Sequence, residues 1–224
     1  MKSNTLKVIH LTGVKTLAAL TLAMIFTATA FADGAVRYDS TPTGNKCTIT
    51  GASGDSVFSH EWTMASPMIG GYIEADEKFP ESALTDAARA KPTVYAKMPV
   101  RTFKSGKSTM DEKMQIMMST TNYANIEYRL IELKPKSKVD AVGALQFEAV
   151  GTLSIAGKTL TNTMPVTIEK KAANLLVKGS APVKMTDYGI TPRVSVPVLG
   201  DISIKDELKI DFEWQLVRKA QPAK

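Results

Sequence analysis

Residues 145–168 read LQFEAVGTLSIAGKTLTNTMPVTI, and this stretch decides the fold. Every second residue from Leu145 to Ile155 is apolar or small, with mainly polar residues between them. The return segment 160–168 alternates in the same way, and only Asn162 breaks its apolar row. This period of two, together with the short link 156–159, predicts one β-hairpin with one face exposed to solvent. Each strand would run roughly 30 Å, longer than usual, which favours a closed barrel over a small sandwich.

Alternation elsewhere supplies the other strands of that barrel. Further strands are expected within the ranges 35–38, 46–50, 61–74, 93–103, 125–133, 175–185 and 208–216. Pro99 indicates a bulge or an edge position, because proline cannot donate to a strand ladder. Residues 192–200 are expected to form a loop. Together these segments predict an all-β fold, a single antiparallel β-barrel of about eight strands with one short amphipathic helix.

The one helix is expected from Thr109 to about Ser119. Thr109 and Glu112 have the spacing of a capping box. Four methionines then fall on one helical face, at Met110, Met114, Met117 and Met118. Core packing is the preferred interpretation of that face, and adaptable contact with a ligand is the alternative.

Residues 1–32 have the composition of a secretory signal peptide. Three lysines precede an uncharged run from Thr16 to Phe31, which ends Ala30-Phe31-Ala32. This run is shorter than the roughly 20 residues that a membrane span needs. We therefore expect cleavage after Ala32 and an exported domain of residues 33–224, periplasmic or secreted from a bacterial cell envelope, without a membrane span.

Charge and reactive side chains limit the possible functions. Without the three lysines of residues 1–32 the net charge falls from +6 to +3, which gives no argument for a nucleic-acid partner. Cys47 is the single cysteine and is expected to be a small buried hydrophobe in a strand. His60, the one histidine after residue 32, is expected to be a hydrogen-bonded turn residue beside Trp62. These counts predict neither a metal site nor an enzyme.

The interior of such a barrel is either filled or holds one small ligand. The inward row is small at Ala149 and Gly151, which favours a void, but the pattern alone leaves a cavity and a solid core equally open. Strand parity and apolar character give the lumen candidates Trp62, Tyr128, Phe147, Ala149, Gly151, Met164, Phe212 and Trp214. The polar ends of the tyrosine and tryptophans would seek a partner on the ligand. Lys97, Arg101 and Arg129 have the opposite parity and are expected to be solvated.

Several local motifs resemble one known family. The stretches are FKSG at 103–106, MDEK at 110–113, Tyr123 before IEY at 126–128, GTLSIAGKT at 151–159 and KMTDYGI at 184–190, with GAS to HEWT at 51–63 in addition. Together they resemble the YceI family of exported lipid-binding or polyisoprenoid-binding proteins over most of the exported chain. The resemblance implies a lipocalin-like antiparallel barrel whose lumen holds an isoprenoid, a quinone or another long amphiphile. The chain departs from commoner members in its early segment and at 191–198, so the identity of the ligand stays open.

The expected function is therefore noncovalent binding of a long apolar ligand for transport, storage or sequestration. The ligand classes are a polyisoprenoid, an isoprenoid quinone and a fatty-acid-like amphiphile, and no covalent cofactor is expected. His60, Tyr188 and Arg193 are the candidates for the headgroup or barrel mouth. The alternative is a ligand-free structural or protein-interaction barrel, with a homodimer possible in either case.

Overall fold

The computed structural model describes residues 35–54, 59–85, 91–138, 141–196 and 200–220. The predicted signal peptide, residues 1–32, lies outside the described residues, so its cleavage stays a prediction.

The described chain is mostly strand. The strands are β1 (Ala35–Ser40), β2 (Lys46–Gly54), β3 (Ser59–Ser66), β4 (Gly70–Asp76), β5 (Thr93–Pro99), β6 (Asn125–Pro135), β7 (Ala144–Ile155), β8 (Lys158–Lys171), β9 (Asn174–Lys184), β10 (Arg193–Val196), β11 (Gly200–Ser203) and β12 (Glu207–Arg218). The helices are α1 (Ser82–Thr85) and α2 (Ser108–Met117), with 3-10 turns η1 (Val100–Thr102) and η2 (Thr186–Tyr188).

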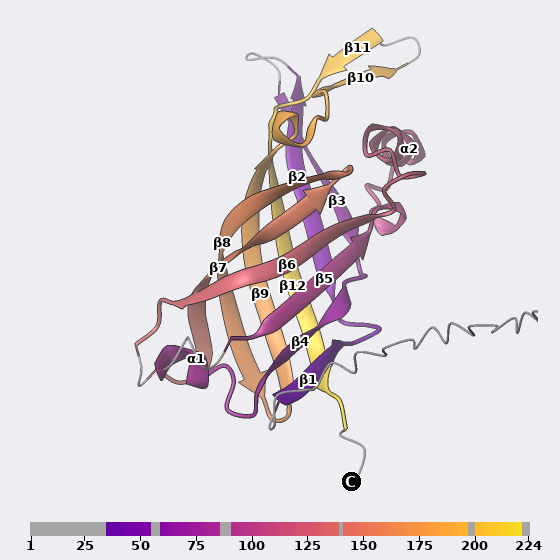
Figure 1. The fold of residues 1–224 in the computed structure, drawn as a ribbon. Coiled ribbons are helices and arrows are strands. Elements are labelled where there is room, and N and C mark those ends of the chain that lie inside the picture. The colour runs from indigo at the N-terminus through magenta and orange to yellow at the C-terminus, as the bar shows by residue number, and fades with distance from the viewer. Residues whose placement is uncertain (1–34, 55–58, 86–90, 139–140, 197–199, 221–224) are drawn as a thin grey trace, which may run out of the picture. The chain divides into compact units, whose positions relative to one another are not determined.

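Eight antiparallel strands close into a barrel. The ring runs β1-β4-β5-β6-β7-β8-β9-β12, and β12 returns to β1 through pairs such as Ser40 with Leu216. The other half of β12 pairs with β2, and β2 pairs with β3, so these two strands extend the wall beyond β1 and β4 (Figure 1). The predicted antiparallel barrel of about eight strands is thus confirmed.

The predicted hairpin of residues 145–168 forms, with a shorter link than the expected 156–159. β7 and β8 pair without interruption from Ala144 with Glu169 to Ile155 with Lys158. Only Ala156 and Gly157 lie between the strands, with φ of 47° and 83°. Two positive φ angles are the mark of a type I′ turn, whose twist matches that of the strands it joins.

The alternation of β7 places its apolar row inside. Its buried side chains are Leu145, Phe147, Ala149, Leu153 and Ile155, each at most 5% exposed. The outer faces of the sheet carry ion pairs such as Lys178 with Glu213, whose nitrogen and oxygen lie 3.2 Å apart. Lys97, Arg101 and Arg129 are exposed, as strand parity predicted.

Some local expectations were wrong. Lys107, not Thr109, is the N-cap residue of α2, and it makes no side-chain capping bond, so the predicted capping box does not form. Residues 192–200 do not form the expected loop: residues 193–196 form β10, which pairs with β11 at 200–203, and Val194 and Ile202 face one another as a paired apolar set. The turn η1 replaces the end of the strand predicted at 93–103, and the short α1 was not foreseen. His60 lies within β3, paired with Ser53, and not in a turn.

The ladder between β8 and β9 is incomplete. These strands pair only from Val166 with Gly179 to Lys171 with Asn174. Within the described part of the chain, the first half of β8, which includes Asn162, therefore pairs with β7 alone. Asn162 Nδ2 reaches across to the carbonyl oxygen of Pro182 on β9, at 3.5 Å.

Candidate functional site: two apolar cavities of the barrel

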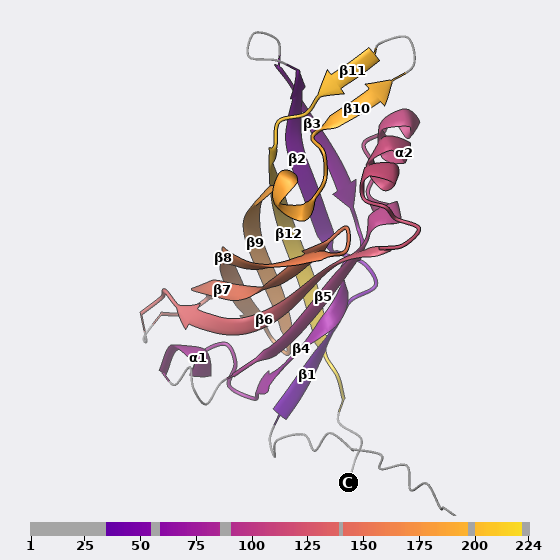
Figure 2. The same ribbon diagram turned by 45° about the horizontal axis from the view of Figure 1, so that its top comes forward.

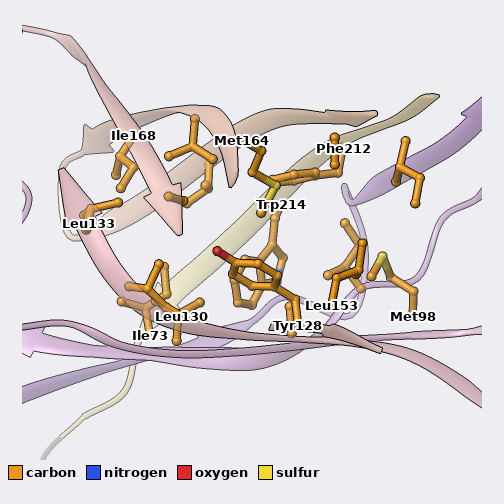
Figure 3. Close-up of a pocket in the computed structure, with 18 of the residues that line it drawn as sticks. Ile73, Met98, Tyr128, Leu130, Leu133, Leu153, Met164, Ile168, Phe212 and Trp214 are labelled. Carbon is orange, nitrogen blue, oxygen red and sulfur yellow. The ribbon is translucent and has the colours of Figure 1, made fainter. Parts of the chain in front are cut away.

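A deep cavity of about 80 Å³ lies inside the ring of strands. Its lining is apolar on all sides and comes from strands on opposite walls of the barrel (Figure 3). Representative lining side chains are Leu130, Leu153, Met164, Ile168, Phe212 and Trp214. Such a surface excludes ions and attracts hydrocarbon.

Tyr128 brings a polar atom to this cavity. Its ring lies over Gly151, where an added β-carbon would come within 2.4 Å of both Cζ and Oη of Tyr128. The side chain is 7% exposed, and its hydroxyl has no hydrogen-bond partner among the described residues. Figure 3 shows the hydroxyl oxygen directed into the space between the labelled side chains. Burial raises the pKa of this phenol, so it is neutral and keeps its proton for donation.

Trp214 contributes only apolar surface to the cavity. Its indole Nε1 donates to Ser40 Oγ at 3.0 Å, and the Ser40 hydroxyl in turn donates to the Ile69 carbonyl oxygen. Nearby, the buried Asn45 donates to the Thr41 carbonyl oxygen at 2.6 Å. The polar end of Trp214 is therefore satisfied by the protein and not available to a ligand.

A larger cavity of about 460 Å³ lies at the mouth. It is enclosed by α2, by β2 and β3, and by the hairpin β10–β11, elements that lie at the same end of the barrel in Figure 2. Six methionines share in its lining, namely Met64, Met110, Met114, Met117, Met118 and Met185. Lys107 and Lys113 are the charged members of the lining. The methionine face of α2 therefore borders a cavity, where its unbranched side chains can adapt to a guest.

The two cavities follow one another along the barrel interior. Ile49 lines the mouth cavity, and its cross-strand partner Ile210 lines the deep one. On β12, Leu208 belongs to the mouth and Ile210 to the deep cavity, two residues further on. Successive inward residues of one strand are roughly 7 Å apart, so the cavities are separated by about one layer of side chains.

The structure brings most of the predicted lumen residues together. Tyr128, Ala149, Met164, Phe212 and Trp214 line the deep cavity. Trp62 lines the mouth cavity instead.

The two remaining lumen candidates line neither cavity. Phe147 is buried, but it is absent from the lining of both. Gly151 is covered by the Tyr128 ring, so its small size seats an aromatic side chain and does not leave a void.

The predicted mouth residues do not meet at either cavity. His60 is exposed on β3. Tyr188 is buried in η2, and burial raises its pKa. Arg193 is exposed on β10, with Nη1 3.6 Å from an oxygen of Asp201. None of the three is part of the two linings.

Sequence reasoning missed Asn162 and the far wall of the mouth cavity. Asn162 was visible as the single polar break in an apolar row, but nothing nearby in sequence marked its partner. Met185 ends the strand expected at 175–185 and Ile202 comes from a segment without a clear period, so both could be assigned to the mouth only from the fold.

Cys47 matches its prediction. It is fully buried in β2, and its Sγ lies 3.4 Å from Met98 Sδ. Burial raises the pKa of the thiol to about 12. Within the described ranges no group of three or more His, Cys, Asp or Glu is placed to hold a metal ion, and no helix there is both long and apolar enough to span a membrane.

Solved structures share this fold. A polyisoprenoid-binding domain from Saccharophagus degradans, implicated in plant cell wall breakdown, superposes with a TM-score of 0.59 at 12% identity, covering 81% of this chain and 98% of that one. The Burkholderia cenocepacia protein BcnA superposes with a TM-score of 0.56 at 16% identity, covering 75% and 95%. No curated protein matches the sequence.

The family model of the YceI-like domain matches residues 38–216, which contain the lining of both cavities and the ring of strands except the outer ends of β1 and β12. The chain therefore belongs to the YceI-like family.

Proposed function

We propose that this protein is exported and binds one long apolar ligand noncovalently, with the ligand occupying the deep cavity and the mouth cavity together. The observation that carries this proposal is that only about one layer of side chains, at the pair Ile49 and Ile210, separates the two apolar cavities.

The volumes favour a ligand that spans both spaces. The deep cavity, at about 80 Å³, is far below the roughly 300–1,000 Å³ of ordinary ligand sites, whereas the mouth cavity, at about 460 Å³, lies within that range. A chain that enters by the mouth and extends past Ile210 would gain about 0.8 kcal/mol for each methylene it buries. Affinity would thus grow with chain length without any charged contact.

Isoprenoid, quinone and fatty-acid-like chains all fit this description. The Saccharophagus neighbour is described as polyisoprenoid-binding, which supports an isoprenoid ligand for this chain as well. The proposed place of action is the periplasm or the exterior of a bacterial cell, because residues 1–32 have signal-peptide character. The proposed role is binding, because both linings are mainly apolar.

Native mass spectrometry of the exported protein, followed by organic extraction, tests the proposal. We expect a stoichiometric apolar adduct on the wild-type protein. The variant Ile210→Phe, which fills the junction of the cavities, should lose this adduct. Ile131→Phe is the matched control, because Ile131 is 64% exposed on β6. A bare mass for the wild-type protein under gentle conditions, and no uptake of added lipid, would favour a ligand-free structural or protein-interaction barrel.

A further inference from the structure

Two buried polar atoms of the described side chains lack a hydrogen-bond partner, and they belong to neighbouring positions. These atoms are Tyr128 Oη and Asn162 Oδ1. Buried polar groups in proteins are nearly always satisfied, so two orphans at one place require an explanation.

Gly151 connects the two groups. Tyr128 Oη lies against Gly151, on the face where its β-carbon would be. Asn162 is the cross-strand partner of Gly151 in the β7–β8 ladder. Paired residues of an antiparallel ladder direct their side chains to the same face. The phenol and the amide oxygen therefore lie on the inner face, over adjacent strands.

The lining of the deep cavity, to which Tyr128 but not Asn162 belongs, offers the phenol no partner. Besides Tyr128, the lining of the deep cavity consists of hydrocarbon side chains, two thioethers and the indole of Trp214, whose N–H is already bonded to Ser40. Asn162 Nδ2 donates to the Pro182 carbonyl oxygen, whereas Oδ1, which can only accept, receives no hydrogen bond from a described residue.

We propose that Tyr128 and Asn162 recognise a neutral oxygen function of the bound ligand, in the first place a hydroxyl group, deep within the barrel. The phenol donates a hydrogen bond to the ligand oxygen, and the ligand hydroxyl donates to Asn162 Oδ1. One hydroxyl group on the ligand then satisfies both buried atoms, because a hydroxyl is donor and acceptor at once.

The chemistry of the pair also sets the class of ligand. The lining of the deep cavity contains no cationic side chain, so a phosphate or carboxylate would be buried there without a counter-charge. A saturated or olefinic hydrocarbon would leave Tyr128 Oη and Asn162 Oδ1 without a hydrogen-bond partner. The pair therefore favours oxygenated isoprenoids, such as an alcohol or a quinol, which enter with the oxygen first. This inference rests on the proposed function, because it specifies the ligand of the same cavities.

Phytol and phyt-2-ene test the inference, since they differ only in the hydroxyl. Each is delivered from cyclodextrin, and the fraction bound is measured by native mass spectrometry. One neutral hydrogen bond corresponds to about fivefold in affinity, so wild-type protein should bind phytol at least about fivefold more tightly. Tyr128→Phe and Asn162→Leu should each lower phytol affinity by about fivefold and leave phyt-2-ene affinity within about twofold.

Tyr95→Phe is the matched control, because Tyr95 lies on β5 outside both linings. Thermal melting of each variant separates loss of binding from loss of fold. Equal affinity of the wild type for both probes would overturn the inference and leave the proposed function intact. A loss in Tyr128→Phe that is the same for both probes would overturn it too, since it would show a packing role or a bridging water. Binding of neither probe by folded wild-type protein would overturn the proposed function itself.

Discussion

Gly179→Ala tests how the wall of the deep cavity is packed. Gly179 lies on β9, where it pairs with Phe212 of β12 and with Val166 of β8. An added β-carbon would lie 2.5 Å from Cζ and 2.7 Å from Cε1 of Phe212, and 3.0 Å from Cγ1 of Val166. These contacts are shorter than van der Waals distance, so the Phe212 ring would have to move, and the free side of the ring faces the cavity.

The expected cost follows from those distances. Overpacking in a well-packed core costs about 1–3 kcal/mol, against a gain of about 0.4–1 kcal/mol from the lower chain entropy of alanine in the unfolded state. The net expectation is a loss of about 0.5–2 kcal/mol. A melting temperature falls by about 2–4 °C per kcal/mol for a domain of this size. Ligand uptake should fall as well, because the displaced ring enters a space of about 80 Å³.

A double-mutant cycle isolates the contact. Phe212→Leu removes the two ring carbons nearest to the added methyl group, so Gly179→Ala should be neutral or stabilising in that background. We expect a coupling energy of about 1–3 kcal/mol from urea unfolding. Gly70→Ala is the control, because its nearest neighbour is the flexible Lys97 side chain at 3.3 Å. An equal loss in both backgrounds would refute the packing argument.

Four smaller changes probe other parts of the molecule. Cys47 should not react with a disulfide reagent in the folded protein at pH 7, because its pKa is raised to about 12. In urea one equivalent of the reagent should react, which is measured by the absorbance of the released thiol. Tyr128→Phe should raise the stability of the ligand-free protein by about 1 kcal/mol in urea titrations, since it removes an unsatisfied buried hydroxyl. Asn45→Ala should cost about 1–3 kcal/mol, because it leaves backbone groups near Trp214 without partners. Burial acts to raise the pKa of Asp111, but hydrogen bonds from Ser105 outweigh it and lower this pKa, so the carboxylate stabilises the fold at neutral pH. That stabilisation is lost as the pH falls through the folded pKa, and melting curves of Asp111→Asn should depend less on pH in this acid range than those of the wild type.

The sequence predicted the wall of the barrel better than its contents. The alternation from Leu145 to Ile155 was enough to place one hairpin and its inner face, because a strand has only two faces. The filling of the lumen depends on diagonal neighbours across strands that are distant in sequence. Gly151 suggested a void, yet the Tyr128 ring from β6 occupies that place.

The mouth shows the same limit more strongly. The helical spacing of Met110, Met114 and Met117 defined one face of α2, but periodicity does not say what lies opposite that face. The opposite wall comes partly from β10 and β11, whose four-residue strands are too short to show a clear period. An apolar helix face was therefore interpreted as core packing, although it borders a cavity of about 460 Å³.

Glycines opposite aromatic rings explain how so small a barrel keeps open space. Gly51 lies against Trp62, Gly151 against Tyr128 and Gly179 against Phe212, with ring atoms 2.4–2.5 Å from each missing β-carbon. Each ring can lie flat on the wall because the neighbouring residue has no side chain. A larger residue at any of these glycines would push its ring inward and divide the apolar space. For the proposed ligand, these three contacts would limit the length of chain that the barrel accepts, while Tyr128 and Asn162 would select the group that reaches the interior.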